Sequence, residues 1–75
     1  MSLEKIFSEI FLLPEVSVLD SLTLSEIPTW DSLSHMMLIV RLEEIYNVQF
    51  TGDEIADIKS VSDVRTALQL HGTVL

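Results

Sequence analysis

Residues 32–46 constrain the fold most, because their hydrophobic side chains occupy two sides of one predicted helix. Asp31 or Ser32 is suited to cap its start, and Asp31 lies at the positive end of the helix dipole. At about 100° per residue, one face of this helix gathers the side chains that we expect in the core. These side chains are Leu38, Ile39, Leu42, Ile45 and Tyr46.

A second apolar stripe remains on the opposite side of the same helix, formed by Leu33, Met36 and Val40. Glu43 and Glu44 continue this side, and Ser32 points into the same half. Helices that are apolar all round are usually buried, in which case both faces belong to the core and Ser32 is only a cap. The alternative is a helix that docks partners along the second stripe, beside a site of chemistry.

The chain is long enough for one small domain, which we predict over residues 1–75. It contains no cysteine, so neither a disulfide nor a Cys-based zinc site can stabilise it. His35 and His71 are too few and too far apart in the sequence for a structural metal site. Helix packing must therefore supply the stability.

Charge and hydropathy exclude several classes of partner. Twelve acidic against four basic residues give a net charge of -8, whereas nucleic acids and anionic membranes attract basic surfaces. The longest apolar run, residues 36–40, is too short to cross a membrane, and the N-terminus lacks a signal-peptide pattern. We therefore expect a cytoplasmic, monomeric protein with no nucleic-acid or membrane partner, which docks to basic patches on other proteins.

A first helix is predicted over residues 3–13, with Ser2 suited to cap its start and Pro14 to end it. The following residues 15–29 have no helical period and predict a long ordered loop, with a short turn at residues 23–26. Trp30 closes this loop and is expected to be a packing anchor. The side chains expected to pin the loop to the core are Val16, Val18, Leu22, Leu24 and Ile27.

Two shorter helices are predicted after the central one. Thr51 and Glu54 have the spacing of a capping box ahead of a third helix over residues 53–58. Ser60 and Asp63 mark the start of a fourth helix in the same way. The side chains expected to face inward from these helices are Ile55, Ile58, Val61, Val64, Ala67 and Leu68.

Two kinds of chemical site are weakly indicated. Asp31, Ser32 and His35 have the residue types of a hydrolase triad, and Ser32 and His35 lie one helical turn apart. The sequence supplies neither an oxyanion hole nor a water-excluding pocket, so we expect a protein that is not an enzyme. The acidic residues within segment 53–57 lack the glycine and the ligand spacing of an EF-hand, and we expect them to be solvated.

The order of motifs resembles that of the acyl carrier protein family over nearly the whole chain. Residues 31–33, Asp-Ser-Leu, open the central helix, and Leu38, Leu42, Glu43, Glu44 and Tyr46 follow. Residues 48–50 are extended, a short acidic helix follows, and residues 60–64, Ser-Val-Ser-Asp-Val, open the last helix. The resemblance implies an all-α four-helix bundle of acyl-carrier type, with a long loop between helices 1 and 2 and a short third helix.

The same resemblance implies a carrier of acyl groups. A phosphopantetheinyl transferase would attach 4'-phosphopantetheine from coenzyme A to the Ser32 oxygen, and the thiol of this arm would hold acyl or aminoacyl groups as thioesters. Further partners would be acyl-activating, condensing or acyl-transfer enzymes with basic docking patches. Partner contacts are implied for Asp31, Leu33, Met36, Met37, Val40, Glu43, Glu44 and Ile58. Contacts with a tucked acyl chain are implied for Leu38, Leu42 and Tyr46.

Three departures from the carriers of fatty acid biosynthesis favour a carrier dedicated to another pathway. Many of those carriers have glycine two residues before the aspartate, whereas residues 29–30 are Thr-Trp here. Residues 34–37 are uncharged where those carriers are acidic, and Arg41 replaces a small residue. We expect a role in polyketide, nonribosomal peptide, lipid or envelope-sugar modification. A carrier-like interaction module that is never modified is the alternative.

Overall fold

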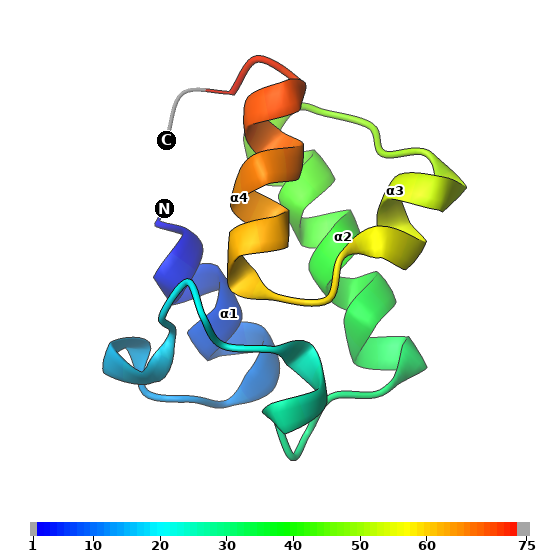
Figure 1. Ribbon diagram of the computed structural model, residues 1–75. Coiled ribbons are helices and arrows are strands. Elements are labelled where there is room, and N and C mark those ends of the chain that lie inside the picture. Colours follow the sequence, from blue (N-terminus) through cyan, green and yellow to red (C-terminus); the bar gives the residue numbers. More distant parts are fainter. Residues whose placement is uncertain (1, 74–75) are drawn as a thin grey trace.

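The computed structural model describes residues 2–73, which form four α-helices and no strand (Figure 1). In chain order the helices are α1 (Leu3–Phe11), α2 (Ser32–Tyr46), α3 (Gly52–Asp57) and α4 (Val61–Leu70). Two short 3-10 helices, η1 (Glu15–Ser17) and η2 (Leu24–Glu26), lie between α1 and α2. The predicted all-helical bundle is thus confirmed for the described residues.

α2 begins and ends where the sequence predicts, because both of its ends are capped. The Asp31 carboxylate accepts a 2.8 Å hydrogen bond from the Ser34 N–H, and the Ser34 hydroxyl accepts one of 2.8 Å from the Asp31 N–H. At the other end, Asn47 adopts a left-handed conformation with φ 53°, which asparagine tolerates better than most residues. These caps satisfy backbone groups that the helix leaves without partners.

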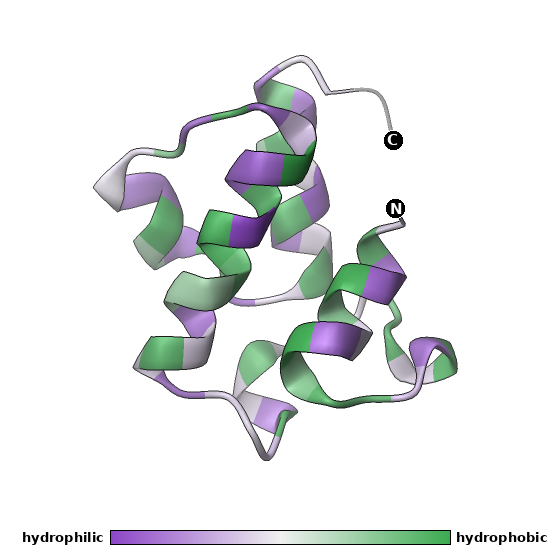
Figure 2. Cartoon of the chain, turned by 180° about the vertical axis from the view of Figure 1, so that it is seen from behind, coloured by the Kyte–Doolittle hydropathy of each residue, from purple (hydrophilic) through white to green (hydrophobic). Residues whose placement is uncertain are grey.

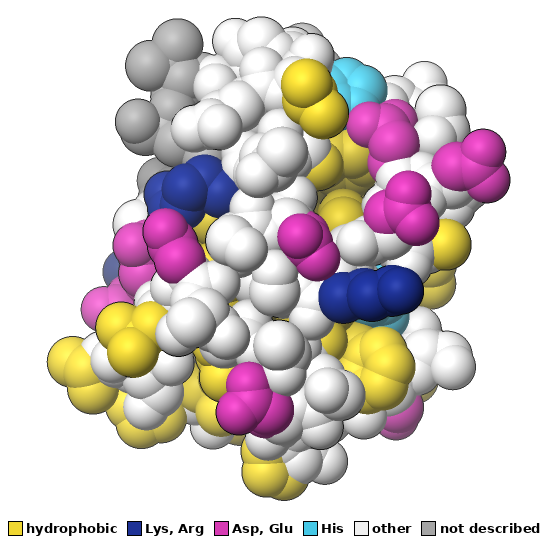
Figure 3. Space-filling view, in the orientation of Figure 1, with side chains coloured by type: hydrophobic (Ala, Val, Ile, Leu, Met, Phe, Trp, Pro, Cys, Tyr) yellow, Lys and Arg dark blue, Asp and Glu magenta, His cyan; other side chains and the backbone are white. Residues whose placement is uncertain are grey.

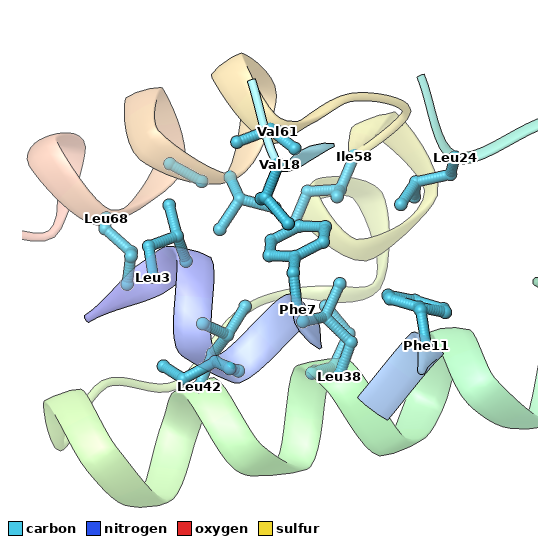
Figure 4. Close-up of a cluster of buried hydrophobic side chains, with 14 of the residues drawn as sticks. Leu3, Phe7, Phe11, Val18, Leu24, Leu38, Leu42, Ile58, Val61 and Leu68 are labelled. Carbon is cyan, nitrogen blue, oxygen red and sulfur yellow. The ribbon is translucent and has the colours of Figure 1, made fainter. Parts of the chain in front are cut away.

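The core is assembled mainly from α1, α2 and α4. Phe7 of α1 lies between α2 and α4, and Leu38 and Leu42 point toward it from α2 (Figure 4). Each of these three side chains is fully buried, and burying a large apolar side chain contributes about 1.5–3 kcal/mol. The predicted inner faces of α2 and α4 are confirmed, since Leu38, Ile39, Leu42, Val61, Val64, Ala67 and Leu68 are buried while Ile45 and Tyr46 pack against them.

The segment between α1 and α2 is held across one end of the bundle (Figure 1). η2 begins with a capping box of Thr23 and Glu26, at the turn that the sequence predicts. The backbone of this segment pairs with the linker between α3 and α4. The Leu24 N–H donates to the Lys59 carbonyl oxygen at 2.9 Å, and the Val61 N–H donates to the Leu22 carbonyl oxygen at 3.0 Å.

The predicted boundaries of two helices, α1 and α3, were wrong. α1 ends two residues earlier than predicted, because Leu12 turns into the left-handed region with φ 59° ahead of Pro14. α3 lies one residue earlier at both ends, because Thr51 is its N-cap and Gly52 its first helical residue. The capping box that predicts α3 is present, since Thr51 and Glu54 exchange hydrogen bonds of 2.9 and 3.2 Å.

The apolar side chains of the segment between α1 and α2 divide into buried and exposed ones. Val18, Leu24 and Ile27 are buried as predicted, and Leu22 packs against the core. Val16 is 85% exposed, so the prediction that it pins the segment was wrong. The reason is that residue 16 lies in the middle of η1, a three-residue turn that contributes no buried side chain.

The core position of Leu42 predicts a large loss of stability in Leu42→Ala. Truncating a fully buried leucine is expected to cost about 2–5 kcal/mol of unfolding free energy, measured by urea denaturation. Val40→Ala is the matched control on the same helix. Its side chain is half-exposed, so its change should stay within about 0.5 kcal/mol. Equal losses in the two variants would contradict the assignment of the inner face.

Candidate functional site

Ser32 is the first residue of α2, and it is exposed to solvent. Its neighbour Asp31 directs its carboxylate to the Ser34 N–H. The Ser32 hydroxyl has no hydrogen-bond partner among the described residues. The N-terminus of this 15-residue helix carries the positive end of its dipole. The Ser32 hydroxyl therefore lies at a helix N-terminus, where an added negative charge is stabilised.

Hydrogen bonds from Ser34, in the first turn of the helix that Asp31 caps, keep the Asp31 carboxylate ionised. Hydrogen bonds from the Ser34 backbone N–H and then from its side chain lower the pKa of the Asp31 carboxyl below its ordinary value of 3.8. Both act by stabilising the charged form. Asp31 thus serves α2 as a cap and adds a fixed negative charge beside Ser32.

His35 connects three elements through both nitrogens of its ring. The Trp30 Nε1–H donates to His35 Nδ1 at 3.2 Å, and His35 Nε2 lies 3.0 Å from the Ile55 carbonyl oxygen of α3. An indole N–H can only donate, so Nδ1 accepts and Nε2 carries the proton that it donates to Ile55. Both nitrogens of the His35 ring are therefore engaged in hydrogen bonds.

This arrangement argues against a hydrolase triad of Asp31, Ser32 and His35. A serine nucleophile needs a histidine nitrogen free to accept its proton, and that histidine needs a carboxylate behind it. In this structure Trp30 occupies one nitrogen, a backbone carbonyl occupies the other, and Asp31 bonds to Ser34. What the arrangement offers is an exposed hydroxyl without a base of its own.

A pocket of about 560 Å³ lies beside Ser32, between the start of α2, α3 and η2. Its lining is mainly apolar. Ser32, Trp30 and His35 line it on one side, and Ile55, Ile58 and Lys59 line it on the other. Figure 3 shows a basic side chain next to hydrophobic surface, below the acidic side chains that gather over α3.

The second stripe of α2 is exposed, so it does not belong to the core. Leu33, Met36 and Val40, together with the neighbouring Met37, have exposed fractions between 46% and 71%. Figure 2 shows α1 and α2 side by side, with hydrophobic residues recurring along α2. A groove of about 520 Å³ between the two helices is lined by this stripe and by Ile10. Arg41 and Glu9 pair across it at 3.9 Å.

The other residues implied in partner contacts differ in how they are placed. Glu44 is exposed at the edge of the α1–α2 groove. The Glu43 carboxylate accepts a 2.9 Å hydrogen bond from the Phe50 N–H, so it also holds the chain that follows α2. Ile58 is buried and lines the pocket beside Ser32, so a bound group would contact it there. Leu38 and Leu42, implied in acyl-chain contacts, are fully buried, and Tyr46 is partly buried.

Trp30 is more exposed than a packing anchor should be. Its exposed fraction is 38%, and its ring meets the His35 ring edge-on, with centroids 6.1 Å apart. It forms one wall of the pocket together with His35. The sequence pattern did not indicate the opposite wall, where Leu24, Ser25 and Lys59 meet through the pairing of η2 with the α3–α4 linker.

Other site types find no geometric support in the described residues. Within residues 2–73, no three His, Asp or Glu side chains gather into a group that could hold a metal ion. In the same part of the chain, no helix combines the length and the apolar character needed to span a bilayer. Comparisons with protein-family models and with curated proteins found no match.

The Asp31 cap predicts a pH-dependent contribution to stability. The pKa of this carboxyl is lower in the folded protein than its ordinary value of 3.8, so its stabilisation is present above that pH. It is lost as the pH falls through the folded-state pKa. Urea midpoints of wild type and Asp31→Ala should therefore differ at pH 7 and converge below pH 3.8. A gap that stays constant across this range would count against the cap.

Proposed function

We propose that this protein is an acyl carrier, which holds acyl or aminoacyl groups as thioesters on a 4'-phosphopantetheine arm at Ser32. The observation that carries the proposal is the exposed, unbonded Ser32 hydroxyl at the start of α2, within the Asp-Ser-Leu motif of residues 31–33. A capped helix start presents this oxygen to a second protein. The chain has no cysteine, so the arm would bring the thiol that a thioester needs.

The chemistry at Ser32 requires a partner enzyme. A phosphopantetheinyl transferase would join the Ser32 oxygen to the phosphorus that bears the pantetheine arm of coenzyme A. One phosphodiester forms, the pyrophosphate bond of coenzyme A breaks, and its nucleotide part leaves. The serine proton passes to a base on the transferase, since both nitrogens of His35 are bonded elsewhere. The new negative charge lies at the positive end of the α2 dipole.

The exposed side of α2 supplies a surface for docking. Leu33, Met36 and Val40 follow Ser32 along the helix, and Glu44 lies at the edge of the same surface. An apolar patch with an acidic border suits partner enzymes with basic patches, because opposite charges steer association while apolar contacts supply affinity. The partners would be the transferase and acyl-activating, condensing or acyl-transfer enzymes of a cytoplasmic pathway.

The arrangement of the bundle supports the same proposal. A long segment separates α1 from α2, α3 is short, and α3 lies beside the start of α2 through the His35–Ile55 hydrogen bond. These features agree with the acyl-carrier type of four-helix bundle that the sequence resembles. The uncharged first turns of α2 favour a carrier of one dedicated pathway over the general carrier of fatty acid biosynthesis.

Modification at Ser32 is the direct test. Incubation with coenzyme A and a transferase of broad specificity should add the mass of one phosphopantetheine to the wild type, measured by intact-protein mass spectrometry. Ser32→Ala should add none. Ser21→Ala, which changes an exposed serine outside α2, should be modified like the wild type. A wild type that stays unmodified by several transferases would overturn the proposal and favour the unmodified interaction module.

The docking surface predicts that Met36→Glu leaves the fold intact but weakens recognition. Met36 is about half exposed, so the urea midpoint should remain close to that of the wild type. Loss of a central apolar contact is expected to lower the transferase kcat/KM about tenfold, corresponding to more than 1 kcal/mol. Gln49→Glu adds the same charge at an exposed position outside α2 and should leave the rate unchanged. Unfolding of Met36→Glu would show that the faces of α2 were assigned wrongly.

A further inference from the structure

The line along which α2 and α3 meet, called the seam here, is closed by the His35 side chain. Its ring lies between the two helices, where Nε2 donates to the Ile55 carbonyl oxygen at 3.0 Å. On its other side, Nδ1 accepts the Trp30 indole N–H, which fixes the orientation of the ring. Leu38 follows one turn further along α2 and is fully buried. A group that is attached at Ser32 and moves toward the core between α2 and α3 therefore meets the His35 ring, which hydrogen bonds hold in place on both sides.

The pocket beside Ser32 lies on the solvent side of this closure. Its floor is formed by Leu24 and Ile58, which are 2% and 3% exposed and belong to the hydrophobic core. Its walls include Trp30 and His35. Its volume of about 560 Å³ falls within the range of roughly 300–1,000 Å³ that is usual for small-molecule sites. The space open to a group attached at Ser32 is thus the pocket.

We propose that the group carried on the arm rests in this surface pocket, between Trp30 and α3, and that it is a short acyl or an aryl group. This inference rests on the proposed carrier function. A short chain or a single ring fills the apolar space above Leu24 and Ile58 without entering the core. A long fatty chain would extend from the pocket into water, because Leu38 and Leu42 are fully enclosed behind His35.

The aromatic wall favours a ring in particular. The Trp30 and His35 rings meet at an interplanar angle of 81°, so together they present both a face and an edge. Aromatic groups pack well in such offset or edge-on arrangements. Trp30 is the only tryptophan of the chain, and its ring lines the pocket on the side next to Ser32.

The test loads the complete protein with three cargoes through amide-linked coenzyme A analogues that bear butanoyl, benzoyl or dodecanoyl groups. Intact mass first establishes that each arm is attached, and failure at this step concerns the carrier function alone. NMR spectra of the loaded forms are then compared with those of the protein bearing an empty arm. Butanoyl and benzoyl groups should shift the Trp30 indole N–H and the Ala56 amide, which lies in the pocket lining.

The same spectra contain the outcomes that would overturn the inference. Nuclear Overhauser contacts from any cargo to the Leu38 or Leu42 methyl groups of the wild type would show that the core admits the chain. Unchanged Trp30 and Ala56 signals with both short cargoes would show that the pocket is not used. For the dodecanoyl form, we expect contacts to Trp30 from the carbons nearest the carbonyl and none from the distal carbons.

His35→Ala tests whether the imidazole is what closes the seam. Removing the ring should allow dodecanoyl contacts with Leu38 that the wild type lacks. His71→Ala is the matched control, because it removes the other imidazole that contacts α3, through Glu54 at 2.8 Å. Leu38 contacts in His71→Ala but not in His35→Ala would contradict the assigned role. The wild-type measurements decide the location of the cargo even where a variant fails to fold.

Discussion

The reciprocal hydrogen bonds between Asp31 and Ser34 set where α2 begins, and the position of Ser32 and of the pocket beside it depends on that start. They make Ser32 the first helical residue and leave its hydroxyl in solvent. From this start, packing against the core turns Leu38 and Leu42 inward and leaves Leu33 and Met36 facing outward.

α2 contributes to the core and also presents an exposed apolar side, because its hydrophobic residues are distributed on two sides. One side completes a core around Phe7, while the other leaves four large apolar side chains of residues 33–40 in solvent. Monomeric proteins seldom expose such a patch without a use for it. The net charge of -8 opposes contact between two copies of the chain and favours partners with basic surfaces.

Both histidines of the chain contact α3, and this explains how so short a helix is kept in place. Six residues are too few for a helix to be stable alone, and none of them is fully buried. His35 bonds to the Ile55 carbonyl from α2, and His71 bonds to the Glu54 carboxylate at 2.8 Å from the end of α4. The Thr51 N–H and His71 together lower the pKa of Glu54. These polar contacts add to the packing of Ile55 against the core, and together they position the wall of the pocket.

The local pattern of the sequence determined the helices, their caps and their inner faces. The limits of α2, the Thr51–Glu54 box and the buried stripe of α4 all follow from spacing within a few residues, because capping and helical periodicity are short-range effects. The sequence also singled out Ser32 by its motif. Only the tertiary structure decided that the second stripe of α2 faces solvent and that His35 closes the seam to α3. The pocket was likewise invisible in the sequence, because Trp30, Ile55 and Lys59 come from separate segments whose meeting depends on how the helices pack.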